Sequence, residues 1–245
     1  MNTGSLTERQ GDILKALIKE YVNSAEPIGS EILCDKYKFD FSPATMRNEM
    51  VELTKLGYLQ KDHISAGRFP TPQAFRFFIK NLMDERELPV VNEVAIKQRL
   101  WDNRHNMDYF LREATHALSE ELQNLVMLIT DDHEVYYAGA AHILRHPEFY
   151  DIDLTRNVLH LLDQYDLIQA MFSQLSPDVD FGVMLGDEIG LQTLNQCGMV
   201  ISRIKLPNNL NGYLAVFGPY RLDYPSVIPA VRYLHKVIDD ITRNW

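Results

Sequence analysis

The chain has 245 residues, of which 46% are hydrophobic and 10% aromatic, and its formal net charge at pH 7 is −10. This composition is typical of a globular protein long enough for two domains. No stretch of about 18 consecutive apolar residues predicts a membrane span, and no N-terminal pattern indicates a secretion signal. The two cysteines, Cys34 and Cys197, are too few for a disulfide framework, so we expect a cytoplasmic protein.

The negative charge is distributed unevenly along the chain. Residues 1–80 contain 11 Lys and Arg against 10 Asp and Glu, whereas residues 81–245 contain 13 against 24. Because neutralisation of phosphates supplies most of the non-specific affinity for DNA, one copy of the nearly neutral first part should bind DNA poorly. Tight binding would need two copies on one duplex, which favours a dimer on a palindromic site.

Two helices are predicted in the first 40 residues. Thr7 is a suitable N-cap for the first, and a break at residues 23–29 precedes the second, expected from Ser30 to Tyr37. The apolar residues of the first helix recur at helical spacing: Ile13, Leu14, Leu17, Ile18 and Tyr21.

A third, short helix is predicted from Ser42 to Leu56. Ser42 is a good N-cap, Pro43 suits the first helical position, and Gly57 can adopt the left-handed conformation that closes a helix. One face should pack on a core, because its apolar residues follow helical spacing: Met46, Met50 and Leu53.

The opposite face of this third helix carries Ala44, Thr45, Asn48, Glu52 and Lys55. Small and amide side chains near the start of such a helix can approach base edges in the major groove, where asparagine can pair with adenine and a threonine methyl can touch a thymine methyl. Arg47 lies to one side, where a phosphate is the better partner. Taken alone, the segment could also be an ordinary surface helix.

A hairpin is predicted directly after Gly57. Its first strand begins at Tyr58, and the string HISAGR (63–68) has the small residues of a tight turn, with Arg68 as a positive charge at its tip. Arg68 could enter the minor groove or meet a phosphate. Thr71 then caps a helix from Pro72 to about Asp84. This order of three helices, a hairpin and a helix is that of a winged helix-turn-helix.

Several uncommon strings in this region resemble one known family. They are YVNSAEPIGS (21–30), SPATMRNEM (42–50), GYL (57–59) and HISAGRFPT (63–71). In this order they resemble the bacterial heat-inducible transcription repressor family HrcA over nearly all of the first 80 residues. With the helix and hairpin patterns, the resemblance implies a DNA-binding surface made of Ser42, Ala44, Thr45, Arg47, Asn48, His63, Ser65, Gly67 and Arg68.

A charged segment broken by proline, residues 85–92, is predicted to link a winged-helix domain, residues 1–84, to a second domain, residues 93–245. Helical spacing predicts one helix over Val94–Trp101 and a longer one over residues 107–125. Later elements are expected as a hairpin of Leu125–Ile129 and Val135–Ala138, a helix over 154–175, strands Phe181–Leu185, Met199–Leu206 and Tyr213–Phe217, and a helix over Val227–Ile241. Helices flanking an antiparallel sheet give an α+β domain.

The second part resembles the same family more loosely. The strings HILRHPEF (142–149), GDE (186–188) and GYLAVFGPYRLDY (212–224) are similar to family segments. The family's second domain is GAF-like, so the resemblance implies that fold. Family members are commonly longer, and the stretch absent between Ala117 and Gly139 is where they carry an inserted dimerisation domain. This chain is therefore a short variant whose mode of dimerisation is open.

Other patterns favour structural roles. The segment 131–134 (DDHE) has residue types that bind metals, but a strand turn of this composition is usually solvated. His142 and His146 have helical zinc-ligand spacing, which Pro147 interrupts. Gly212 and Gly218 are expected to serve turns, and Arg221 to form a structural ion pair instead of an anion site. We expect neither a metal nor a cofactor.

The favoured function is a repressor that binds an inverted-repeat DNA operator as a homodimer. The resemblance implies chaperone operons as targets and the GroE chaperonin as a partner that keeps the repressor folded. The alternative is a winged-helix regulator controlled by a small-molecule ligand in the second domain, which would require a deep pocket lined by convergent polar groups. An enzyme is the least favoured class, because no Ser/His/Asp or Cys/His arrangement can be argued from spacing.

Overall fold

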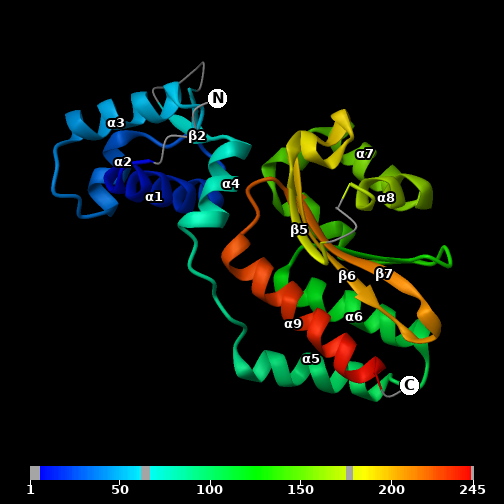
Figure 1. The fold of residues 1–245 in the computed structure, drawn as a ribbon. Helices are drawn as coiled ribbons and strands as arrows, with labels where there is room; N and C mark the ends of the chain where they lie inside the picture. Colours follow the sequence, from blue (N-terminus) through cyan, green and yellow to red (C-terminus); the bar gives the residue numbers. More distant parts are fainter. Residues whose placement is uncertain (1–5, 62–66, 175–178, 244–245) are drawn as a thin grey trace. The chain divides into compact units, whose positions relative to one another are not determined.

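The structure is a computed structural model that describes residues 6–61, 67–174 and 179–243. The chain divides into two compact units, Met1–Asp84 and Glu85–Trp245 (Figure 1). The elements of the first unit are α1 (Glu8–Ser24), α2 (Ser30–Lys36), α3 (Pro43–Lys55), β1 (Leu59–Lys61), β2 (Arg68–Pro70) and α4 (Pro72–Asn81).

Local capping explains where the helices of the first unit begin. The Thr7 side chain accepts a hydrogen bond from the Gln10 amide in a reciprocal capping box. The Ser42 side chain accepts from the Thr45 amide at the start of α3, and the Thr71 side chain from the Ala74 amide at the start of α4. Gly57 follows α3 with a φ of +83°, in the left-handed region. The predicted helix starts and the closing glycine are therefore confirmed.

The core of the first unit is formed where α1, α3 and α4 meet. Leu14 of α1, Met46, Met50 and Leu53 of α3, and Phe75 of α4 are all fully buried. The antiparallel pair β1–β2 lies beside them, and Ile28 adds a third short segment through an antiparallel bridge to Arg68. This arrangement is a helix-turn-helix followed by a wing.

The second unit is built around a five-stranded antiparallel sheet of order β4-β3-β7-β6-β5. Its strands are β3 (Leu125–Thr130), β4 (Val135–Ala138), β5 (Phe181–Leu185), β6 (Cys197–Lys205) and β7 (Asn211–Pro219). Its α-helices are α5 (Val90–Asp102), α6 (Met107–Leu122), α7 (Ile152–Leu162), α8 (Tyr165–Phe172) and α9 (Tyr224–Thr242). Short 3₁₀ helices occur at Ala140–Arg145, Pro147–Tyr150, Gly186–Ile189, Gln192–Leu194 and Pro207–Asn209.

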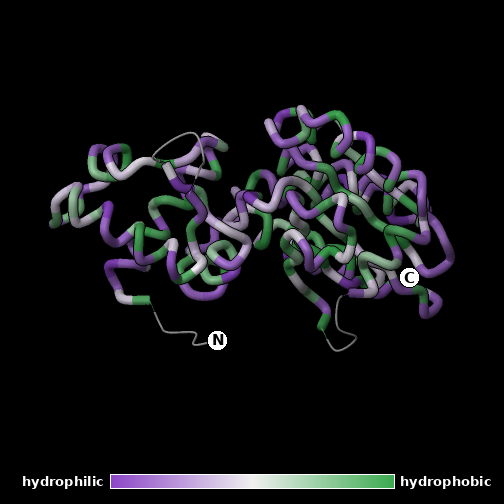
Figure 2. Tube along the Cα trace, turned by 90° about the horizontal axis from the view of Figure 1, so that it is seen from above, coloured by the Kyte–Doolittle hydropathy of each residue, from purple (hydrophilic) through white to green (hydrophobic). Residues whose placement is uncertain are grey.

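Helices cover both faces of this sheet. The side chains of Leu125, Met127 and Ile129 point to one face of β3 and pack in a cluster with α7 and α8. The alternate residues Val126 and Leu128 are also buried, on the face that α6 and α9 cover (Figure 1). In Figure 2, hydrophobic segments gather in the interior of the body that carries the C-terminus. The α+β class with an antiparallel sheet is therefore confirmed.

Two predicted helices differ from the structure. The helix expected from Val94 begins at Val90, so residues 90–92 of the expected linker are helical. The single helix expected over 154–175 is two helices, α7 and α8, separated at Asp163 and Gln164. A tertiary contact explains the break: the Tyr165 ring stacks on His133 at 4.6 Å, and its hydroxyl donates to the Thr130 carbonyl at 3.0 Å.

Two glycines expected in turns lie inside β7 instead. A Cβ at Gly212 would be 2.9 Å from the Ile129 carbonyl oxygen of the neighbouring strand, and one at Gly218 would be 2.7 Å from the Leu222 side chain. Glycine is therefore needed at both positions because neighbouring atoms leave no room for a side chain. Leu125, predicted both as the end of the preceding helix and as the start of a strand, belongs to the strand β3, and α6 ends at Leu122.

Candidate nucleic-acid interface

Helix α3 buries one face and leaves the other in solvent. Met46 and Met50 are fully buried, whereas Ala44, Arg47 and Asn48 are exposed. Ser42 and Thr45 lie at the start of the helix with their hydroxyl oxygens 3.1 Å apart. Five of the residues expected to contact DNA thus lie in the first two turns of α3 or at its cap.

A polar contact holds α3 to α1. Glu49, half-buried in α3, accepts hydrogen bonds from Gln10 at 3.1 Å and from Arg9 at 3.4 Å. This contact uses the side of α3 next to the buried methionines, so it orients the helix without occupying Arg47 or Asn48.

Arg68 is not at the tip of the wing, contrary to the sequence-based expectation. It is the first residue of β2, opposite Lys61 of β1. Its Nε donates to Thr54 Oγ1 of α3 at 3.0 Å, and Thr54 in turn donates to the Met50 carbonyl at 2.7 Å. This chain of hydrogen bonds brings the half-buried Arg68 guanidinium to the C-terminal half of α3.

Arg47 of α3 carries a second positive charge, which acts on Arg68. Burial lowers the pKa of the Arg68 guanidinium, and the nearby positive charge of Arg47 lowers it further. An arginine keeps its proton at neutral pH despite such a shift, so both charges persist. Within residues 6–61, 67–174 and 179–243, neither guanidinium has a carboxylate in salt-bridge contact. A phosphate between them would relieve the repulsion.

The base of the wing is closely packed. Gly67 is buried, and a Cβ there would lie 2.7 Å from Pro27 Cβ and 2.9 Å from the Pro27 carbonyl oxygen. Ile28 exchanges two backbone hydrogen bonds with Arg68, at 2.8 and 3.0 Å. Gly67 is therefore a position of close backbone approach, which explains a glycine there without any contact to DNA.

Sequence reasoning missed Thr54 and Pro27. Thr54 follows Arg47 by seven residues, so helical spacing already places the two on one side of α3. No sequence signal marks Pro27, whose contact with Gly67 depends on chain segments 40 residues apart. Of the expected wing residues, His63 and Ser65 lie outside the described residues.

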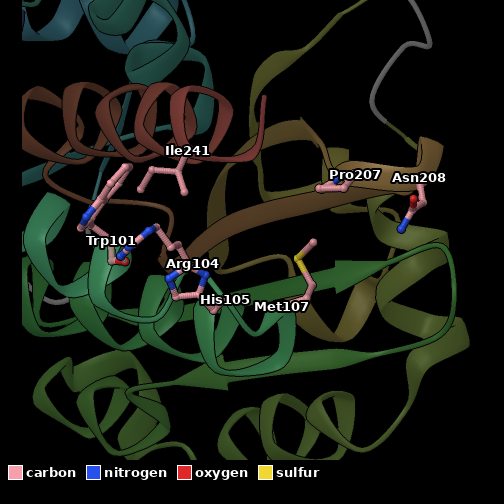
Figure 3. Close-up of a pocket in the computed structure, with 7 residues that line it drawn as sticks. All are labelled: Trp101, Arg104, His105, Met107, Pro207, Asn208 and Ile241. Atoms are coloured by element: carbon pink, nitrogen blue, oxygen red, sulfur yellow. Dashed lines mark hydrogen bonds between the residues drawn. The ribbon is translucent and has the colours of Figure 1, made fainter. Parts of the chain in front are cut away.

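A hollow of about 590 Å³ lies in the second unit, at the junction of α5 and α6 (Figure 3). The Arg104 guanidinium lies 4.3 Å from the centre of the Trp101 ring and donates to the Trp101 carbonyl. Other lining residues come from the start of α6, the β6–β7 loop and α9, and Figure 3 shows Pro207 and Asn208 well apart from Arg104 and His105. Its polar groups do not converge on one point.

The other candidate sites have structural explanations. Arg221, 6% exposed, pairs with Glu148 at 2.6 and 2.9 Å, which confirms the expected ion pair. His142 lies in a 3₁₀ turn with Nδ1 3.4 Å from Ser119 Oγ, and Pro147 starts the next turn. Among the described residues, no three His, Cys, Asp or Glu side chains gather in a way that could hold a metal ion.

Of the helices in the described part of the chain, none combines the length and the hydrophobicity needed to cross a bilayer. A solved structure described as that of a hypothetical protein matches with a TM-score of 0.74 and 15% identity, over 98% of each chain. At that identity the match shows the shared fold.

Two family models match the chain. Residues 5–83 match the winged helix-turn-helix transcription repressor model of HrcA DNA-binding domains, and residues 48–228 match the HrcA protein C-terminal domain.

The heat-inducible transcription repressor HrcA of Symbiobacterium thermophilum is 24% identical over 340 residues, covering 97% of this chain and 99% of its own. That of Carboxydothermus hydrogenoformans is 22% identical over 339 residues, covering 98% and 99%. Both alignments exceed the 245 residues of this chain, so these relatives contain residues that have no counterpart here. The chain belongs to the HrcA family of winged helix-turn-helix transcription repressors.

Proposed function

We propose that this protein represses transcription of chaperone operons by binding an inverted-repeat operator as a homodimer. In each copy, α3 lies in a major groove, with Ala44, Thr45 and Asn48 at base edges. Ser42, Arg47 and Arg68 hold the flanking phosphates, and His63, Ser65 and Gly67 belong to the wing that accompanies them.

The junction of Arg47 and Arg68 carries this proposal. Arg68 of the wing is hydrogen-bonded to Thr54 of α3, and the positive charge of Arg47, an exposed residue of the same helix, acts on it. Such a pair destabilises an isolated protein and favours a complex with a polyanion. Sequence-independent contacts of this kind orient a helix on the duplex, while the neighbouring base contacts supply the specificity.

The test is a gel shift with an inverted-repeat probe across a range of salt concentrations. Arg47→Ala and Arg68→Ala should each weaken binding and flatten the plot of log affinity against log salt by roughly one unit per bound copy. Arg145→Ala, an exposed arginine of the second unit, is the matched control and should change neither quantity. If Arg47→Ala and Arg68→Ala both bind like the unsubstituted protein, the proposed interface is wrong.

A second variant separates the charge of Arg68 from its position. Thr54→Val removes the hydroxyl that accepts from Arg68 Nε while keeping the size of the side chain and the charge. We expect weaker binding with an unchanged salt slope, because the charge stays but is no longer held beside α3. An affinity equal to that of the unsubstituted protein would mean that the Thr54 contact does not position Arg68.

We also propose that the GroE chaperonin controls the amount of folded repressor, since a change of about 1–2 kcal/mol in stability shifts active abundance several-fold. Control by a small ligand is the weaker alternative, because the polar groups around the hollow at the junction of α5 and α6 do not converge. If repression changes when the chaperonin is depleted, control by the chaperonin is supported. If a metabolite changes the operator affinity of the purified protein, control by a small ligand is supported.

A further inference from the structure

Helix α5 exposes an unusually hydrophobic outer face. Val90 is 73% exposed, Val91 72%, Val94 62% and Trp101 45%. Single exposed apolar residues are ordinary on protein surfaces, but a contiguous group on one helix marks an interaction surface. Figure 1 shows α5 as an outer helix of its unit, with α6 and α9 on one side of it.

The inner face of the same helix is already occupied. Ile96 and Leu100 are buried, and Arg99 pairs with Glu113 and Glu120 of α6. Helix α5 therefore already packs on the core through its inner face, and the exposed valines and Trp101 lie on its other side. Val90, Val94, Lys97 and Trp101 follow each other at intervals of four, three and four residues, the spacing with which one helix packs along another.

The outer face of α5 has little net charge, so it would not repel the same face of a second copy of the chain. Each copy has a net charge of −10, so two copies repel over most of their surfaces. The outer face of α5 carries one exposed lysine, Lys97, and one exposed aspartate, Asp102, and the latter accepts a hydrogen bond from Gln98. Its charges therefore cancel where the apolar residues gather.

The two ends of the face carry different apolar side chains. Val90 and Val91 project at its N-terminal end, and Trp101 borders the hollow of about 590 Å³ at its C-terminal end (Figure 3). If two α5 helices run antiparallel about a two-fold axis, the valines of each copy meet Trp101 of the other. Exposed Ala95, near the middle, permits close approach of the two helices.

We propose that the outer face of α5 is the surface through which two copies of this chain pair, antiparallel helix against helix. The inference rests on the homodimer of the proposed function and names its interface. A helix of 13 residues is about 20 Å long, which makes a small interface, so the dimer dissociates in the micromolar range. The second operator half-site then completes assembly on DNA.

The test measures mass by sedimentation over roughly 1–100 μM protein, a range that brackets the expected dissociation constant. Val94→Glu should weaken pairing by at least about tenfold, since an antiparallel interface buries the new carboxylate twice. Ile152→Glu, at an equally exposed apolar residue of α7, is the matched control and should pair like the unsubstituted chain. Val91→Glu repeats the test if Val94→Glu fails to fold by circular dichroism.

A fluorescence measurement tests the location directly. In a Trp245→Phe background Trp101 is the remaining tryptophan, and its emission should shift to longer wavelength as the dimer is diluted. With Val94→Glu the shifted emission should be present at all concentrations. If the emission wavelength of Trp101 stays constant on dilution while the sedimentation mass falls from dimer to monomer, the α5 interface is wrong.

Failure of the α5 interface and failure of the homodimer give different results. If Val94→Glu and Val91→Glu dimerise as well as the unsubstituted chain, α5 is not the interface, while the homodimer stands. If the unsubstituted chain stays monomeric in solution and also binds the palindromic probe as a single copy, the homodimer itself is wrong, and the α5 interface with it.

Discussion

The two units of this protein use charge in opposite ways. In the first, nearly neutral unit, the positive charges of Arg47 and Arg68 act on each other, and among the described residues no carboxylate is in salt-bridge contact with either. In the acidic second unit, Arg221 is buried in a bidentate pair with Glu148. The comparison indicates that an arginine paired with a carboxylate stabilises a fold, whereas an arginine without a carboxylate in salt-bridge contact can serve an anionic ligand.

The largest expected effect comes from breaking the buried pair of the second unit. Arg221→Met should destabilise that unit by about 3–5 kcal/mol, because it leaves the Glu148 carboxylate buried without its partner. Urea unfolding followed by circular dichroism measures the loss. The double variant Arg221→Met/Glu148→Leu should recover most of it, and a double variant as unstable as the single one would show that the charge is not the cause.

A smaller effect is expected at the base of the wing. Gly67→Ala should cost up to about 3 kcal/mol, because the new methyl would meet the Pro27 backbone and move β2, with Arg68, away from α3. Thermal unfolding and operator affinity should both fall. Gly29→Ala is the control: a Cβ there meets nothing within 4 Å, and its φ of −86° suits alanine. Equal behaviour of the two variants would contradict the packing argument.

Substitution on the exposed face of α3 should change the affinity for DNA but not the stability of the fold. Asn48→Ala should cost about 1–3 kcal/mol in affinity for the best operator and relax the base preference at one position of each half-site. Competition gel shifts with probes substituted at single positions measure both. Asn81→Ala, at the end of α4, should leave them unchanged. If Asn48→Ala lowers the affinity for all probes equally, Asn48 does not contact a base.

The smallest effect concerns pH and the first unit. The hydrogen bond from Lys36 lowers the pKa of Glu20 below its ordinary value of 4.5, and the Tyr37 hydroxyl acts in the same direction. A lowered pKa contributes stability that is complete above the unfolded pKa and disappears as pH falls through the folded value. Glu20→Gln should therefore cost at most about 1 kcal/mol at pH 7.

That difference should shrink as the pH falls below 4.5 and vanish in acid once the Glu20 carboxyl of the folded protein is itself protonated. Melting temperatures of the two proteins at both pH values provide the measurement. Exposed Glu31 of α2 is the matched position, and Glu31→Gln should have no effect at either pH. A Glu20→Gln variant that is equally destabilised in acid would show that packing, not charge, is responsible.

Much of the first unit could be predicted from sequence because its signals are local. Thr7, Ser42 and Thr71 cap the helices that follow them, and Gly57 ends α3, each through contacts within a few residues. The buried and exposed faces of α3 follow from helical periodicity alone. The position of Arg68 could not be predicted in this way, because it depends on the pairing of β2 with Lys61 and Ile28.

In the second unit, strand positions were predictable and connections were not. Alternating and continuous apolar runs located all five strands to within two residues. The separation of α7 from α8 follows instead from Tyr165 packing on His133, 32 positions earlier in the chain. Gly212 and Gly218 look like turn residues until the neighbouring strand and Leu222 are in place.

By itself the sequence determined the class of the protein, its helix boundaries at capped ends and the side chains that α3 presents, because those properties arise from neighbours along the chain. Tertiary structure alone decided that Arg68 of the wing is hydrogen-bonded to Thr54 of α3, that Arg221 is paired, and that the valines of α5 face outward. These facts depend on segments far apart in sequence, whose contacts form only when whole helices and strands pack together.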